Sequence, residues 1–105
     1  MNISSISPQE VKDLLERSKG SMLLLDVRSE EEYQHVHIDG AKLIPLNALV
    51  ARMGELDKNK KIIIYCASGN RSRYACEILQ EKRFDVANMA GGIGAWMVHG
   101  LATVS

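Results

Sequence analysis

Short apolar runs alternate with helix-start signals along this chain, and that alternation constrains its fold more than any other feature. The runs at 22–25, 41–46 and 62–65 are mostly or wholly apolar, which is typical of strands covered on both faces in a parallel sheet. Ser7-Pro8-Gln9-Glu10 and Ser29-Glu30-Glu31-Glu32 each place a serine three residues before a glutamate, which is the pattern of a helix capping box. Strands and helices that alternate at this spacing predict an α/β domain with a mostly parallel sheet.

Further elements complete the predicted order. A short strand at 3–6 opens the chain, and a helix at 72–82 leads to a strand at 85–89. A final helix begins after Gly91-Gly92. Asn47 is the candidate N-cap of a short helix. That helix would bury three side chains: Leu49, Val50 and Met53.

The length and charge of the chain limit its class and its partners. Its 105 residues predict a single domain that spans residues 1–105. Thirteen basic and 13 acidic residues give a net charge of zero, which disfavours nucleic acid or an anionic membrane as a partner. No apolar run approaches the ~18 residues of a transmembrane helix, and the first residues lack the pattern of a signal peptide. We therefore expect a cytoplasmic protein with no nucleic-acid or membrane partner.

The two cysteines differ in their predicted surroundings. Two are too few for a disulfide scaffold, and neither has the spacing of a zinc site. Cys76 falls within a helix beside Ala75 and Leu79, so we expect a packed core thiol. Cys66 comes directly after the strand at 62–65, at the edge where open α/β sheets bind ligands. If one cysteine reacts, we expect it to be Cys66.

The segment YCASGNRS, residues 65–72, offers small and turn-prone residues between that strand and the next helix. Backbone N–H groups in such a loop can turn inward and form an anion-binding nest at a helix N-terminus. These dipoles, together with Arg71, would lower the pKa of the Cys66 thiol and favour the thiolate. Gly69 supplies backbone freedom, and Asn70 tolerates the left-handed region. The loop therefore suits a nucleophilic thiolate, although a lone cysteine after a strand can also be an inert small hydrophobe.

Five motifs, in order and at similar separations, resemble single-domain rhodaneses. They are DVR (Asp26–Arg28), EEY (Glu31–Tyr33), HIDGAKLIPL (His37–Leu46), YCASGNRS (Tyr65–Ser72) and GGIGAW (Gly91–Trp96). The resemblance runs from about Ser7 to Gly100, nearly the whole chain. It implies a three-layer α/β/α domain with a five-stranded, largely parallel sheet, and chemistry of the thiosulfate sulfurtransferase type.

The resemblance also implies roles for particular residues. Cys66 would take a sulfane sulfur from thiosulfate or a persulfide donor, carry it as a persulfide, and pass it to cyanide or a thiol, without a metal or organic cofactor. The active-site loop would comprise Ala67, Ser68, Gly69, Asn70, Arg71 and Ser72. Its amides would stabilise the persulfide anion, and Arg71 would attract the sulfonate end of the donor. Asp26 and Arg28 are expected to form a supporting charge network with a carboxylate such as Glu32.

The chain departs from the family pattern at a few positions. Ala67 stands where the family frequently has a larger polar or basic residue, so the loop carries less positive charge and its donor preference is open. Val36 and Asp39 stand where the family often has Gly and Pro, within a turn that we expect to be structural. A shallow site with small loop residues is also compatible with a persulfide borne by a protein.

Three alternatives compete with sulfur transfer. A cysteine phosphatase or arsenate reductase needs a Cys-x5-Arg loop that wraps a tetrahedral oxyanion, whereas Cys66 and Arg71 form Cys-x4-Arg, one residue shorter. A rhodanese-like module used for binding or regulation often lacks the cysteine that this chain keeps. A disulfide redox protein would need a second thiol close to Cys66, and Cys76 is poorly placed for that role.

Overall fold

A single parallel sheet forms the centre of the protein, as the computed structural model shows for residues 2–18 and 20–105. Its strands are β1 (Ser5–Ile6), β2 (Met22–Asp26), β3 (Lys42–Leu43), β4 (Lys61–Tyr65) and β5 (Asp85–Met89). They lie in the order β1-β5-β4-β2-β3, and every neighbouring pair is parallel. The predicted α/β fold with a five-stranded sheet is confirmed, and β4 is its central strand.

The helices start largely where the sequence predicts. They are α1 (Pro8–Arg17), α2 (Glu30–His35), α3 (Leu49–Arg52), α4 (Asn70–Glu81) and α5 (Gly92–Val98), with single 3-10 turns η1 (Leu46–Ala48) and η2 (Met53–Glu55). Both predicted capping boxes are present: Ser7 Oγ accepts from Glu10 N–H, and Ser29 Oγ accepts from Glu32 N–H. Within the described residues, no helix combines the length and apolar character needed to span a membrane.

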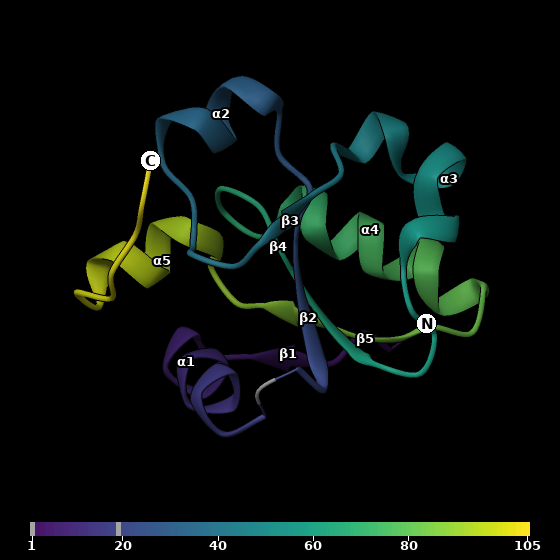
Figure 1. Ribbon diagram of the computed structural model, residues 1–105, viewed down its shortest axis with the longest axis horizontal. Coiled ribbons are helices and arrows are strands. Elements are labelled where there is room, and N and C mark those ends of the chain that lie inside the picture. Colours follow the sequence, from purple (N-terminus) through teal and green to yellow (C-terminus); the bar gives the residue numbers. More distant parts are fainter. Residues whose placement is uncertain (1, 19) are drawn as a thin grey trace.

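Helices cover both faces of the sheet, with α1 and α5 on one side and α3 and α4 on the other (Figure 1). Alternate side chains of β4 divide between two buried clusters because successive residues of a strand point to opposite faces. Ile62 and Ile64 pack in the cluster that includes Leu79 of α4. Ile63 and Tyr65 pack in the cluster on the α1 and α5 side. The three-layer arrangement explains why the central strands are apolar on both faces.

The segment between α2 and β4 differs from the prediction. The strand expected over 41–46 is reduced to β3, although the N–H groups of Ile44 and Leu46 still donate to the carbonyls of Asp26 and Val27. Asn47 does not cap a helix: it lies inside η1, and α3 begins without a side-chain cap. Leu49 is buried as expected, but Val50 is 65% exposed, because only one face of this short helix meets the core.

Candidate active site

The carboxyl ends of the three central strands meet at one edge of the sheet. Asp26 ends β2 and pairs in register with Tyr65, the last residue of β4. Cys66 follows directly, and Asn88 lies near the end of β5 in register with Ile64. The sheet therefore brings a carboxylate, a thiol and a carboxamide to the edge where parallel sheets bind ligands.

Cys66 lies at the base of the loop that joins β4 to α4. The residue is 1% exposed. Its Sγ accepts a hydrogen bond from the Gly69 backbone N–H at 3.1 Å and lies 3.3 Å from Ser72 Oγ. Gly69 is the N-cap of α4 with a φ of +113°, a conformation that side chains rarely adopt, so glycine is required for this turn. The loop thus closes around the sulfur atom.

The two thiols differ in acidity, in the direction predicted. Burial raises the pKa of the Cys66 thiol, but the hydroxyl and backbone N–H of Ser72 and the amides of Gly69 and Ser68 outweigh burial and leave the pKa below its ordinary value. Cys76 lies in the core of α4, where burial raises its pKa to about 12. Cys66 is therefore the thiol that ionises more readily.

Asn88 is a site residue that the sequence reasoning missed. Its Oδ1 accepts a hydrogen bond from Ser72 Oγ at 2.5 Å, and its Nδ2 donates to the Gly69 carbonyl at 3.3 Å. The Ser72 hydroxyl also lies 3.1 Å from that carbonyl. A carboxamide near the end of an otherwise buried apolar strand was the available signal, since such a group needs polar partners.

The first turn of α5 contacts the backbone of the loop between β4 and α4. The N–H groups of Ile93 and Gly94 donate to the carbonyls of Cys66 and Ala67, at 2.8 and 3.0 Å. A Cβ atom on Gly92 would lie 2.4 Å from the Cys66 carbonyl oxygen. Gly92, which the sequence indicated only as part of a helix start, lets the first turn of α5 approach the backbone of the loop.

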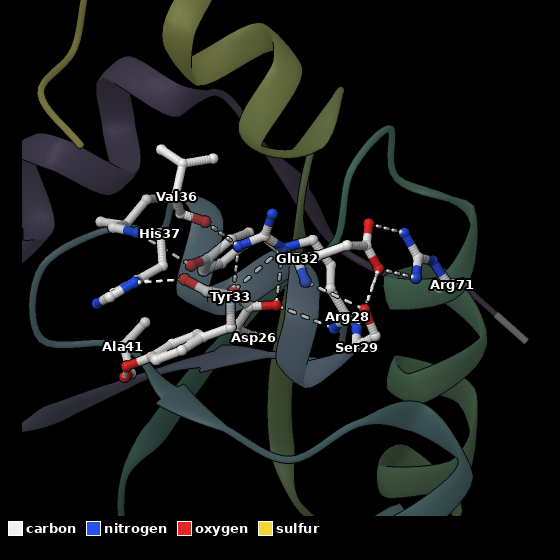
Figure 2. Close-up of polar contacts among 11 residues, drawn as sticks. Asp26, Arg28, Ser29, Glu32, Tyr33, Val36, His37, Ala41 and Arg71 are labelled. Carbon is white, nitrogen blue, oxygen red and sulfur yellow. Dashed lines mark hydrogen bonds and ion pairs between the residues drawn. The ribbon is translucent and has the colours of Figure 1, made fainter. Parts of the chain in front are cut away.

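Asp26 and Arg28 form the predicted pair beneath this edge. Arg28 Nη2 lies 2.7 Å from Asp26 Oδ2, and its Nε lies 3.0 Å from Oδ1, with both residues buried. Arg28 Nη2 also donates to the Val36 carbonyl at 2.7 Å, which ties β2 to the end of α2. The two charges neutralise each other inside the protein, so the pair supports the fold of the site (Figure 2).

Glu32 does not join that pair, contrary to the expected network. Its carboxylate accepts two hydrogen bonds from Arg71, from Nη1 to Oε1 at 2.7 Å and from Nη2 to Oε2 at 2.9 Å (Figure 2). Arg71 therefore binds α2 through both terminal nitrogens. The arginine predicted to meet the donor is already engaged with a carboxylate.

The remaining loop residues differ in their exposure. Ala67 is half-buried, and Ser68 and Asn70 are exposed. A cavity of about 550 Å³ opens beside Arg71. Its lining comprises Val27, Ser29, Glu30, Pro45, Leu46, Asn47, Arg71 and Tyr74. Within the described part of the chain, no group of three or more His, Cys, Asp or Glu side chains is arranged to hold a metal ion.

A buried cysteine with a lowered pKa, in a short loop after the central strand of this fold, agrees with the family comparison. The family described as Rhodanese-like domain matches residues 7–99. The chain belongs to the rhodanese-like domain family. Among its rhodanese-like relatives, a protein named Sulfurtransferase from Allochromatium vinosum is 39% identical over 85 residues, which cover 80% of this chain and 79% of that protein.

Two further comparisons place this rhodanese-like domain among single-domain and larger proteins. A probable adenylyltransferase/sulfurtransferase, MoeZ, from Mycobacterium tuberculosis is 36% identical over 96 residues, which cover 89% of this chain but only 24% of MoeZ. The crystal structure of a rhodanese-related protein from Thermoplasma volcanium superposes with a TM-score of 0.89 at 29% identity, covering 96% of this chain and 97% of that one. The similarity thus spans nearly the whole of one chain and about a quarter of the other.

Proposed function

We propose that this protein is a sulfurtransferase that carries a sulfane sulfur as a persulfide on Cys66. One observation carries the proposal: the Cys66 sulfur lies within hydrogen-bond distance of the Gly69 amide and the Ser72 hydroxyl, which favour its ionised form. The sulfurtransferase relatives support the reaction class. The substrates we propose are thiosulfate or a persulfide as donor, and a thiol, free or on a protein, or cyanide as acceptor.

The first half-reaction would load the cysteine. The Cys66 thiolate attacks the terminal sulfur of thiosulfate, a new S–S bond forms, and the bond to the sulfonate sulfur breaks as sulfite leaves with the electron pair. With a persulfide donor, R–S–S–H, the same attack releases the thiolate R–S⁻. The Gly69 amide, and the Ser68 and Ser72 amides that also favour an anion here, would stabilise the negative charge of the bound persulfide.

The second half-reaction would restore the thiolate. An acceptor thiolate attacks the terminal sulfur of the Cys66 persulfide, the S–S bond to Cys66 breaks, and the acceptor leaves as a persulfide. Cyanide would leave as thiocyanate. In each half-reaction one S–S bond breaks, and one S–S bond, or the C–S bond of thiocyanate, forms. No external oxidant or reductant is consumed, so the reaction needs only the Cys66 thiol and the groups around it.

The loop geometry favours sulfur over phosphate. The Gly69 amide and the Ser72 hydroxyl both lie close to the Cys66 sulfur, and the loop is one residue shorter than an oxyanion cradle. Arg71, which would have to contact phosphate oxygens, is bound to Glu32 instead. Retention of Cys66 with a lowered pKa likewise favours catalysis over a purely binding or regulatory module.

Intact-mass measurement tests the proposal. After incubation with thiosulfate or an alkyl persulfide and removal of excess donor, we expect the non-reduced protein to gain the mass of one sulfur atom. Cys66→Ala should abolish the gain, whereas Cys76→Ala should retain it because that thiol is buried with a raised pKa. Cyanide should then remove the added mass. Failure of every donor to load the wild-type protein would overturn the proposal.

A further inference from the structure

We infer that Glu32 determines the charge preference of the site: by binding Arg71 it disfavours a dianionic donor such as thiosulfate relative to a donor with one charge or none. The inference rests on the proposed sulfur transfer, which defines what the donor must reach. Glu32 does not touch the reacting sulfur, so it acts through Arg71 as a positioning residue.

The Glu32 carboxylate is held by hydrogen bonds from two residues, Arg71 and Ser29. Both terminal nitrogens of Arg71 donate to the two carboxylate oxygens of Glu32 in a bidentate pair. Glu32 Oε1 also accepts from Ser29 N–H at 3.0 Å and Ser29 Oγ at 3.1 Å, so the capping box of α2 holds the carboxylate in place. The Arg71 hydrogen bond lowers the pKa of Glu32 to about 2, so the carboxylate is charged at neutral pH.

The positive charge of Arg71 is thereby neutralised at the entrance to the loop. Ala67 contributes no charge where a basic side chain would attract an anion. Glu30 lines the cavity beside Arg71, so it adds a further negative charge on that side. Asp26 and Arg28 neutralise each other below. An approaching anion would therefore meet backbone dipoles but no free cation among these residues.

A single substitution separates the charge of Glu32 from its structural role. Glu32→Gln removes the negative charge, and glutamine at this position still supports a capping box with Ser29. Arg71 then keeps its positive charge but loses its bidentate carboxylate partner. Because the electrostatic free energy doubles when the charge of the ligand doubles, we expect an effect of about threefold for a monoanion and about tenfold for a dianion. Glu31→Gln is the matched control, since it removes one charge from an exposed residue of the same helix.

Donor competition is the first test. In Glu32→Gln, the ratio of kcat/KM for thiosulfate, a dianion, to kcat/KM for an alkyl persulfide, which is a monoanion at neutral pH, should rise about threefold, and high salt should reduce the gain. In Glu31→Gln the ratio should stay at the wild-type value. Equal changes for both donors, or equal changes in both variants, would overturn the inference and leave the proposed sulfur transfer intact.

Alkylation is the second test, and it requires no sulfur transfer. Iodoacetate carries one negative charge and iodoacetamide none, and the ratio of their rates with Cys66 at one pH cancels the thiolate fraction. Measured in a Cys76→Ala background, this ratio should rise about threefold in Glu32→Gln and not in Glu31→Gln. An unchanged ratio in Glu32→Gln would refute the charge effect. Loss of sulfur transfer in the wild type, with the alkylation effect present, would refute the proposed function alone.

Discussion

Ser72 Oγ lies 3.3 Å from Cys66 Sγ, and the same hydroxyl donates to Asn88 Oδ1 over 2.5 Å. A hydroxyl has one proton, so it donates either to the carboxamide or to the sulfur. With a neutral thiol, the Ser72 hydroxyl can donate to Asn88 Oδ1 while the Cys66 thiol donates to Ser72 Oγ. When Cys66 ionises, the thiolate becomes the stronger acceptor and the hydroxyl can turn toward it. The pair therefore links the charge of the sulfur to a residue of β5.

Removal of the Ser72 hydroxyl should raise the pKa of Cys66. We expect Ser72→Ala to raise it, because the hydroxyl of Ser72 donates a hydrogen bond that favours the thiolate. The pH dependence of iodoacetamide alkylation in a Cys76→Ala background measures the change. Ser68→Ala removes the side chain of an exposed loop serine and should leave the midpoint unchanged. An identical shift in both variants would contradict a specific role for Ser72.

A negative charge at position 88 should act in the same direction. Asn88→Asp keeps the shape and an acceptor for Ser72 but places a carboxylate beside the loop. Like charges disfavour each other's ionised forms, so the alkylation midpoint of Cys66 should move to higher pH. Asn59→Asp, in the exposed turn before β4 at the opposite edge of the sheet, is the control. A wild-type midpoint in Asn88→Asp would show that position 88 is not coupled to the thiol.

The sequence predicted those parts of the fold and site that depend on local pattern. The spacing of apolar residues and the capping residues indicated the helices and the central strands. Cys66 at the end of the strand at 62–65 indicated the thiol that the following loop surrounds. These features are local because a capping box, an apolar run or a turn is encoded within a few neighbouring residues.

Contacts between distant segments were predicted less well. Arg71 and Glu32 are 39 positions apart, and Ser72 and Asn88 are 16 apart, so neither pairing leaves a local pattern. The partner of Arg71 depends on the position of α2 relative to α4. That position is set by the assembled sheet and not by the sequence near either residue. From the sequence, Glu32 was therefore assigned to the network of Asp26 and Arg28. The misassigned Asn47 cap has a different cause, because Pro45 and the short η1 turn impose the local backbone.

A methyl group at position 92 should disrupt the loop without touching a catalytic side chain. In Gly92→Ala the new Cβ would lie 2.4 Å from the Cys66 carbonyl oxygen, and the residue has a φ of +62°, so the loop or α5 must shift. We expect a loss of about 1–3 kcal/mol in the free energy of unfolding and a large drop in sulfur transfer. Gly54→Ala, with open space around it, should preserve both. Urea denaturation and kcat/KM are the measurements.

Arg28 should matter for stability far more than an exposed cation. Arg28→Met leaves Asp26 charged and buried without its partner, and such a loss typically costs about 3–5 kcal/mol. Lys12→Met, which removes one side of the exposed pair with Glu16, should change the urea midpoint little. Comparable midpoints for the two variants would contradict the view that the buried pair holds this edge of the sheet together.

The bond between Glu32 and Arg71 should make the protein sensitive to acid. The folded-state pKa of Glu32 is lowered to about 2, below the ordinary value of 4.5, so the carboxylate stabilises the fold above about pH 4.5 and loses this effect as the pH falls toward 2. In Glu32→Gln the free energy of unfolding should therefore fall less steeply between pH 4.5 and 2 than in the wild type. Urea denaturation at several pH values measures the two slopes, with Glu31→Gln as the control for the loss of one acidic side chain. Parallel curves for the wild type and Glu32→Gln would mean that the ion pair does not persist in solution.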